Sequence, residues 1–341
     1  MYSFKGDYSE GCHPRILKTM VESNLLQTDG YGLDEYCEAA TKLIKQKLNN
    51  QNVDVHYVAG GTQVNMLAIA HFLKAPEAVL ATYHGHIYGH ECGSIEATGH
   101  KVVPVHTDNG KLLARDVEQA LVEHSDPFDV NIRLVYISNV SEVGTIYTKQ
   151  ELTELRACCN KYNLLLFMDG ARLASALTSS ANDVRFEELT TFFDAFYIGG
   201  TKNGALLGEA LVIVNDDLKP NFRYTYKQRG AMLAKGRLMG IQFYELFKDD
   251  LYFELGTRAN KLALSIKEAF VRNNYRLGYD SYSNLQFPVI PNHLLAKFQA
   301  KYAFNIISPV DAENTCVRFA TSWASDVNKV KELIADIEQL K

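Results

Sequence analysis

The sequence predicts an α/β fold in which a mostly parallel sheet, sandwiched by helices, forms a large domain followed by a smaller C-terminal α+β domain. Short apolar runs alternate with stretches of helical periodicity over residues 1–247, the order that a parallel sheet covered on both faces requires. Near Arg237 the pattern changes to long amphipathic helices. The chain has 341 residues, 47% of them hydrophobic, enough for about two domains. We therefore expect the smaller domain over residues 248–341.

Each expected strand is a short apolar run bounded by turn residues. In the large domain these runs cover residues 55–58, 79–82, 102–105, 133–138, 164–168, 195–198 and 210–214. Helices are expected between them, at residues 63–73, 149–161 and 237–247. A helix over 250–273 should bridge to the smaller domain, which is expected to hold strands at 286–290, 304–308 and 316–320 and a closing helix from about residue 326.

The composition argues against several classes of partner. Charged residues make up 22% of the chain, the net charge is −5, and the only basic cluster lies at 227–237, so neither nucleic acid nor an anionic membrane is expected. No apolar run approaches the roughly eighteen residues of a membrane span, and the N-terminus does not read as a signal peptide. The six cysteines show no CxxC spacing, which favours a reduced compartment. We expect a cytoplasmic protein.

Lys202 is the first candidate for catalysis. It follows the apolar run 195–198 through Gly199-Gly200-Thr201, and the residues around it are small. A lysine in such a setting can be held against a ring and desolvated, which favours imine formation with an aldehyde. The alternative is an ordinary solvated loop lysine.

Asp169 ends another apolar run, 164–168, and should therefore face the crevice where α/β sheets bind ligands. A carboxylate in this position would keep a pyridine nitrogen protonated. The alternative is an N-cap for the helical segment 171–178. Together, Asp169 and Lys202 predict an aldehyde cofactor held as a Schiff base.

Gly60-Gly61-Thr62 lies between an expected strand and an expected helix. Glycines let the backbone approach an anion, the helix N-terminus offers free N–H groups, and Thr62 adds a hydroxyl, so the turn suits a phosphate. An ordinary tight turn between a strand and a helix fits the same residues.

Three further side chains are candidates for the pocket. His86 lies in a segment of glycines, aromatics and histidines. A flat imidazole that stacks on an aromatic ring is the better functional interpretation of this residue. The spacing of His84, His86 and His90 does not favour zinc, and no metal is expected. Arg172 could bind an anion, or could be a surface arginine. Arg318 is a single arginine in an apolar strand, suited either to a substrate carboxylate or to a structural ion pair.

In this order the motifs resemble the pyridoxal-phosphate (PLP) enzymes of fold type I, the aspartate-aminotransferase-like fold, and most closely the threonine aldolase group of the β-eliminating lyase family. The resemblance extends over most of the chain. It rests on Phe4-Lys5-Gly6-Asp7, Gly60-Gly61-Thr62-Gln63-Val64-Asn65, His86-Ile87-Tyr88 with Glu91, Asp169-Gly170-Ala171-Arg172-Leu173, Thr201-Lys202 and Arg318-Phe319-Ala320-Thr321.

The resemblance implies a role for each candidate. Lys202 is similar to the lysine that binds the cofactor aldehyde, Asp169 to the partner of the pyridine nitrogen, and His86 to the histidine that stacks on the ring and acts as a base. Gly61 and Thr62 resemble phosphate ligands, and Arg172 and Arg318 resemble ligands of the substrate carboxylate. The family also implies a homo-oligomer, a dimer or homotetramer, with shared active sites. In such an assembly Lys235 or Arg237 is expected to reach a neighbouring subunit's phosphate.

Three positions depart from the family pattern, all on the substrate side. Gly6 stands where the family usually has serine, Ser141 stands where it commonly has histidine in the segment after Asn139, and Ser322 stands where another histidine is common. The resemblance implies an aldolase that cleaves threonine or allo-threonine to glycine and an aldehyde. The alternatives are a PLP-dependent β-eliminating lyase acting on cysteine- or serine-type amino acids, and a non-catalytic binding protein of the same fold.

Overall fold

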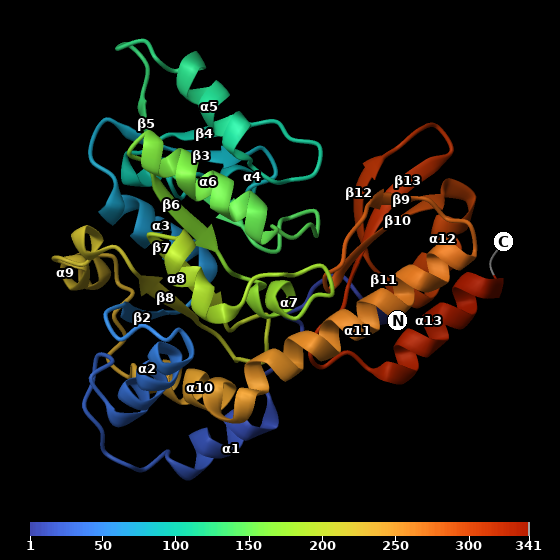
Figure 1. Cartoon of the computed structure of the whole chain (residues 1–341). Helices are drawn as coiled ribbons and strands as arrows, with labels where there is room; N and C mark the ends of the chain where they lie inside the picture. Colours follow the sequence, from blue (N-terminus) through green and yellow to red (C-terminus); the bar gives the residue numbers. More distant parts are fainter. Residues whose placement is uncertain (340–341) are drawn as a thin grey trace.

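The computed structural model describes residues 1–339, and at its centre lies a seven-stranded sheet (Figure 1). Along the sheet the order is β2 (Asp54–Val58), β8 (Glu209–Ile213), β7 (Ala195–Gly199), β6 (Leu165–Asp169), β5 (Asn131–Ser138), β3 (Glu77–Thr82) and β4 (Val102–Val105). All neighbouring strands run parallel except at β8, which is antiparallel to both β7 and β2. The expectation of a mostly parallel sheet is therefore confirmed, and 210–214 does pair beside β7.

Side chains of the central strand alternate between two cores. Leu166 and Met168 of β6 belong to one apolar cluster, which also contains Leu152 of α6 and Phe243 of α10. Leu165 and Phe167 belong to the cluster on the opposite face, where the helix α3 packs. This period of two places Asp169, two residues after Phe167, on the α3 face of the sheet.

Helices cover both faces of this sheet, and Figure 1 shows them around it. They are α1 (Pro14–Glu22), α2 (Glu35–Lys47), α3 (Gly61–Phe72), α4 (His86–Gly89), α5 (Ala114–Glu123), α6 (Lys149–Lys161), α7 (Leu173–Leu177), α8 (Leu189–Phe192), α9 (Phe222–Gln228) and α10 (Arg237–Phe247). The bounds of α6 and α10 are those expected from the sequence. A capping box at Thr148 and Glu151 fixes the start of α6, since each side chain accepts the backbone N–H of the other residue.

The 22-residue helix α11 (Leu251–Arg272) leads from the large sheet to a second, four-stranded antiparallel sheet (Figure 1). The second sheet has the order β12 (Asn305–Pro309), β13 (Asn314–Ala320), β10 (Leu285–Pro291) and β9 (Leu277–Tyr279), with α12 (Asn292–Lys301) and α13 (Val327–Gln339) beside it. The chain also begins here, because β1 (Tyr2–Ser3) pairs in parallel with β11 (Tyr302–Ala303) and Phe4 is fully buried in the same core. A domain boundary between residues 247 and 248 stays a prediction.

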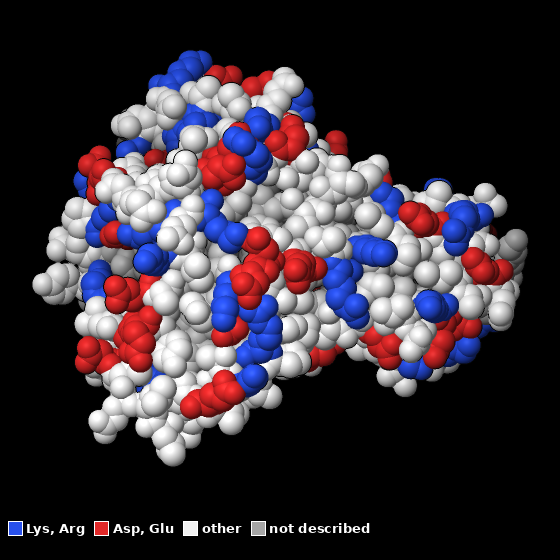
Figure 2. Space-filling view, turned by 60° about the horizontal axis from the view of Figure 1, so that its bottom comes forward, with Lys and Arg blue, Asp and Glu red and all other residues white. Residues whose placement is uncertain are grey.

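Basic and acidic side chains are intermixed on the face shown in Figure 2. That face therefore offers no continuous basic surface. Within residues 1–339, no helix is both long enough and apolar enough to cross a membrane.

The turn that follows β6 packs tightly against β7. A Cβ atom on Gly170 would lie 1.8 Å from the backbone oxygen of Tyr197, and the Gly199 N–H donates to the Gly170 carbonyl at 3.0 Å. Because both partners are backbone, no side-chain movement can make room for a methyl group. The glycine after Asp169 is therefore a requirement of strand packing.

We expect Gly170→Ala to destabilise the protein by about 3 kcal/mol or more, because the two central strands would have to separate. Urea unfolding followed by circular dichroism measures the change. Gly11→Ala is the matched control, since a Cβ there meets nothing within 4 Å. Equal stability of the two variants would contradict this account of the turn.

Candidate active site

The candidate site lies where the carboxyl ends of β5, β6 and β7 meet. The strand register places Ser138 opposite Asp169, and the next residue, Asn139, donates its N–H to the Asp169 carbonyl at 3.0 Å. Lys202 follows the end of β7 by three residues. Parallel strands thus bring together side chains that are far apart in the sequence, at the sheet edge where α/β proteins bind ligands.

Asp169 is buried, and its carboxylate accepts four hydrogen bonds. Tyr136 Oη donates to Oδ2 at 2.5 Å and Tyr197 Oη donates to Oδ1. Asn65 Nδ2 also donates to Oδ2, at 3.3 Å, and the Ala171 N–H donates to Oδ1 at 2.9 Å. Asp169 does not cap the following helix α7, whose N-cap residue is Arg172. The carboxylate is held as a buried, hydrogen-bonded anion.

His86 begins the short helix α4, and its ring is fixed by Glu91. His86 Nδ1 lies 2.8 Å from Glu91 Oε1, which also accepts from Asn65 Nδ2 at 2.8 Å, while Ser94 donates to Glu91 Oε2. The hydrogen bond to Glu91 raises the pKa of His86, against the opposing effect of burial. Since a carboxylate only accepts, Nδ1 carries the proton and Nε2 is the ring nitrogen able to take another. Asn65 links this pair to Asp169.

Lys202 is half-buried in the turn between β7 and β8. That turn is anchored on both sides: Asn203 Nδ2 donates to the Tyr252 carbonyl, and the His13 N–H donates to the Gly204 carbonyl, both at 2.8 Å. The positive charge of Lys202 acts on the buried carboxylates of Asp7 and Glu209. The turn therefore holds the amine near two buried carboxylates.

Arg172 is occupied by a residue from the start of the chain. Its Nε and one terminal nitrogen donate to the two oxygens of Asp7, at 2.7 and 3.1 Å, and Asn284 Nδ2 donates to Asp7 Oδ2 at 2.9 Å. Burial alone would raise the pKa of Asp7, but the Arg172 and Lys202 charges outweigh burial and lower it to about 2. Gly6, expected to contact substrate, directly precedes this ion pair.

Arg318 lies close enough to that pair for their charges to interact. One terminal nitrogen donates to the Lys5 carbonyl at 3.4 Å, whereas its buried Nε has no hydrogen-bond partner within residues 1–339. Burial, followed by the charge of Arg172, lowers the pKa of Arg318. A guanidinium with an unused donor next to a second guanidinium is suited to an incoming anion.

The Gly60-Gly61-Thr62 turn leads directly into α3, whose N-cap is Gly60 and carries no side-chain cap. A Cβ on Gly61 would lie 2.9 Å from Tyr197 Oη, so glycine is needed for the turn to approach the tyrosine. Thr62 is exposed at the start of the helix. The first N–H groups of α3 are thus left for a ligand or water.

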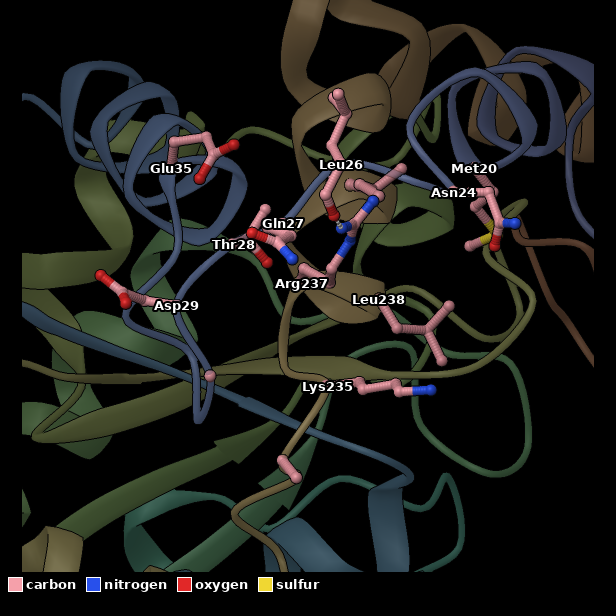
Figure 3. A pocket seen from close by; sticks show the side chains of 13 residues that line it. Met20, Asn24, Leu26, Gln27, Thr28, Asp29, Glu35, Lys235, Arg237 and Leu238 are labelled. Carbon is pink, nitrogen blue, oxygen red and sulfur yellow. Dashed lines mark hydrogen bonds between the residues drawn. The ribbon is translucent and has the colours of Figure 1, made fainter.

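The basic segment 227–237 borders a groove on another side of the molecule. Figure 3 shows Arg237 hydrogen-bonded to the Leu26 carbonyl, to which it donates at 2.6 Å, and Lys235 extending away from it. Arg237 also donates to the Ser23 carbonyl. For Lys235, no hydrogen bond or ion pair is present within residues 1–339. Both side chains line the groove together with Met20, Asn24 and Gln27.

Sequence reasoning missed four polar side chains of this site. Tyr136 and Tyr197 lay inside apolar strands, and the register that aims their hydroxyls at Asp169 is a long-range property. Glu209 is a carboxylate that is fully buried in β8. Because acidic residues are rarely fully buried, its place beside the apolar run 210–214 was a signal that the sequence did carry. Glu142 directly follows Ser141, which is one of the three departures from the family pattern.

The half-buried carboxylate of Glu142 lies within electrostatic reach of five side chains. They are His84, His86, Tyr136, Arg172 and Arg318. Of the three departures from the family pattern, Ser141 and Ser322 make local hydrogen bonds, since Ser141 Oγ pairs with Thr145 Oγ1 at 2.6 Å and Ser322 Oγ donates to Glu10 at 3.2 Å. Glu142, next to Ser141, adds a negative charge near Arg172 and Arg318.

Comparison with known proteins gives matches along the whole chain. A family model described as beta-eliminating lyase matches residues 12–272. The low specificity L-threonine aldolase of Pseudomonas aeruginosa is 28% identical over 339 residues, which are 98% of this chain and 96% of that protein. The structure of Leishmania major threonine aldolase has a TM-score of 0.98 and 46% identity, covering 100% of this chain and 99% of that chain. A histidinol-phosphate aminotransferase of Clostridium acetobutylicum, 12% identical with a TM-score of 0.75 and covering 100% and 99%, shares the fold.

Glu209 makes the stability of the protein depend on pH. Burial raises its pKa from the ordinary 4.5 to about 7, although the hydrogen bonds from Thr201 and Gly200 oppose this. The folded state therefore keeps a proton that the unfolded state has lost, and the stability linked to that proton falls as pH rises from about 4.5 through about 7. Glu209→Gln removes this loss and keeps an acceptor for the Gly200 N–H.

We expect Glu209→Gln to match the unsubstituted protein near pH 4.5 and to exceed its stability by about 3 kcal/mol at pH 8. Urea unfolding of cofactor-free protein at both pH values measures the difference. Exposed Glu313→Gln is the control and should show no such dependence. A constant offset between the two proteins at both pH values would contradict the assignment.

Proposed function

The chain belongs to the β-eliminating lyase family, and on that premise we propose that it is a lyase that cleaves threonine or allo-threonine to glycine and an aldehyde. The observation that carries the proposal is the match, over the whole chain and at 46% identity, to a threonine aldolase. The convergence of Asp169 and Lys202 at one sheet edge, with Arg172 and Arg318 near Asp7, supports it independently. An amino acid with a β-hydroxyl group is therefore the substrate class.

We propose pyridoxal 5'-phosphate as the cofactor, because the residues present fit it. The uncapped N-terminus of α3, with Gly61 and Thr62, suits the phosphate. Asp169 is an anion suited to the ring nitrogen, His86 supplies a flat ring to stack on it, and Lys202 supplies an amine for its aldehyde. When bound, the cofactor supplies an electron sink for the negative charge left at Cα as the Cα–Cβ bond breaks.

The protein's own groups then bind the substrate and move its proton. Arg318 offers its unused Nε to the substrate carboxylate, and Arg172, held by Asp7, contributes positive charge beside it. His86 Nε2 takes the proton of the β-hydroxyl, while Glu91 holds Nδ1 and stabilises the charged imidazole. Glu142 adds negative charge on the same side, which favours the protonated form of His86.

We further propose a homo-oligomer with shared active sites in the cytoplasm. Leu26, which lines the groove of Figure 3, is 55% exposed, and Val21 and Leu25, close to it in the sequence, are 69% and 92% exposed, a pattern typical of subunit interfaces. A neighbouring subunit that covers this surface would bring Lys235 and Arg237 towards its own phosphate. All six cysteines are free, which suits a reduced compartment.

The purified protein loaded with pyridoxal phosphate and given L-allo-threonine should release glycine and acetaldehyde, detected by chromatography and a coupled dehydrogenase. Lys202→Ala should abolish turnover and the visible absorbance of the lysine-bound cofactor. Pyruvate and ammonia from a cysteine or serine derivative, without aldehyde from L-allo-threonine, would establish β-elimination instead. A visible band that survives Lys202→Ala would exclude that lysine.

Glu142→Gln should shift the acid limb of kcat/KM for L-allo-threonine cleavage to lower pH. Removing the carboxylate takes away negative charge near His86, so the pKa of His86 falls and the neutral base persists to lower pH. Glu142→Asp keeps the charge and is the control, with a limb close to that of the unsubstituted enzyme. An unmoved acid limb in Glu142→Gln would contradict the role of His86 as the base.

A further inference from the structure

Two tyrosines, one from each neighbouring strand, hold Asp169 between them. Tyr136 of β5 lies opposite Phe167 of β6, and Phe167 lies opposite Ala195 of β7. Tyr197, two residues beyond Ala195, therefore lies level with Asp169. Because side chains alternate along a strand, all three polar groups point to the same face of the sheet. Each hydroxyl donates to a different oxygen of the carboxylate.

Both hydroxyls can act only as donors to Asp169. A carboxylate accepts and does not donate, so each Tyr O–H must point at it. Burial, followed by the charge of Asp169, raises the pKa of Tyr136 and of Tyr197 well above the ordinary value. The two phenols therefore stay protonated, and the donors persist across the working pH range.

The carboxylate has no acceptor position to spare. Asn65 and the Ala171 N–H complete a set of four donors, which matches the four lone pairs that a carboxylate offers. A ring nitrogen carrying a proton must therefore replace one of them. Asn65 makes the longest of these bonds, 3.3 Å, and already has a shorter one, 2.8 Å, to Glu91.

Tyr197 also contacts the turn proposed to bind phosphate. Its hydroxyl occupies the space that a side chain on Gly61 would need, 2.9 Å from the ideal Cβ position. The same hydroxyl therefore lies next to both the turn proposed to bind phosphate and the carboxylate of Asp169.

We propose that Tyr136 and Tyr197 are positioning residues of the cofactor site, which hold Asp169 charged and at a fixed place so that the ring nitrogen can replace Asn65 on it. The inference rests on the proposed function, since it presumes that pyridoxal phosphate binds here. The tyrosines do not touch reacting atoms. Tyr136 acts through Asp169, and Tyr197 acts through Asp169 and through its packing against Gly61.

The test is the affinity of cofactor-free protein for pyridoxal phosphate in Tyr136→Phe and Tyr197→Phe, followed by absorbance titration. Each change removes one donor to a buried anion and keeps the ring, so binding should weaken roughly ten-fold or more. The pH dependence of the visible band should change as well. Tyr147→Phe is the matched control, because its buried hydroxyl bonds the backbone of Leu112 and not Asp169, and its affinity should stay unchanged.

A double-mutant cycle separates positioning from a general packing effect. In an Asp169→Asn background, Tyr136→Phe should change cofactor affinity by less than about two-fold, because the anion that the tyrosine serves is gone. A loss as large as in the unsubstituted background would overturn the proposal, and so would single variants with unchanged affinity and spectrum. If either Tyr136→Phe or Tyr197→Phe is insoluble, the double-mutant cycle is carried out with the other variant. Failure of the unsubstituted protein to bind pyridoxal phosphate would instead refute the proposed function.

Discussion

A buried carboxylate at the end of β6 determines how the centre of this molecule is arranged. An anion away from water is stable only where donors surround it, and Asp169 receives them from a strand on each side, from α3 and from its own turn. Parallel pairing of β5, β6 and β7 in one register is what brings the two phenols to it. Gly170 and Gly61 then follow as consequences, since both let the backbone come close to Tyr197.

The charges around this anion form two separate groups. His86, Glu91, Asn65 and Asp169 make a connected hydrogen-bonded chain on the cofactor side. Asp7, Arg172 and Asn284 form a second group on the substrate side, with Arg318 and Glu142 beside it. Lys202 lies where it interacts with Asp7 of the second group. In the proposed function, the first group would hold the cofactor while the second would receive the amino acid.

Local pattern was enough to predict the parallel sheet and the candidates at strand ends. Apolar runs in the sequence identified β6 and β7. Asp169 directly follows the first run, and the second run leads to Lys202. The local sequence pattern failed to predict those features that depend on contacts between residues far apart in the chain. The polar tips of Tyr136 and Tyr197 read as strand interior, and the start of the chain gave no hint of pairing with β11. The helices α1, α2 and α5 were not among the expected elements, although each of them is amphipathic. The ion pair of Arg172 was not expected, because its partner lies 165 residues away.

Several contacts of the first seven residues are made with residues that are synthesised much later. Tyr2 pairs with Tyr302, the Phe4 carbonyl accepts from the Ala320 N–H, and Asp7 is held by Asn284. At a typical rate of 5–20 residues per second, residue 320 follows the N-terminus by roughly 15–60 seconds. During that interval the large sheet can already form, while the amino-terminal strand has no template. The contacts of the first residues with residues 284–320 therefore form late in biosynthesis, only after that stretch has been synthesised.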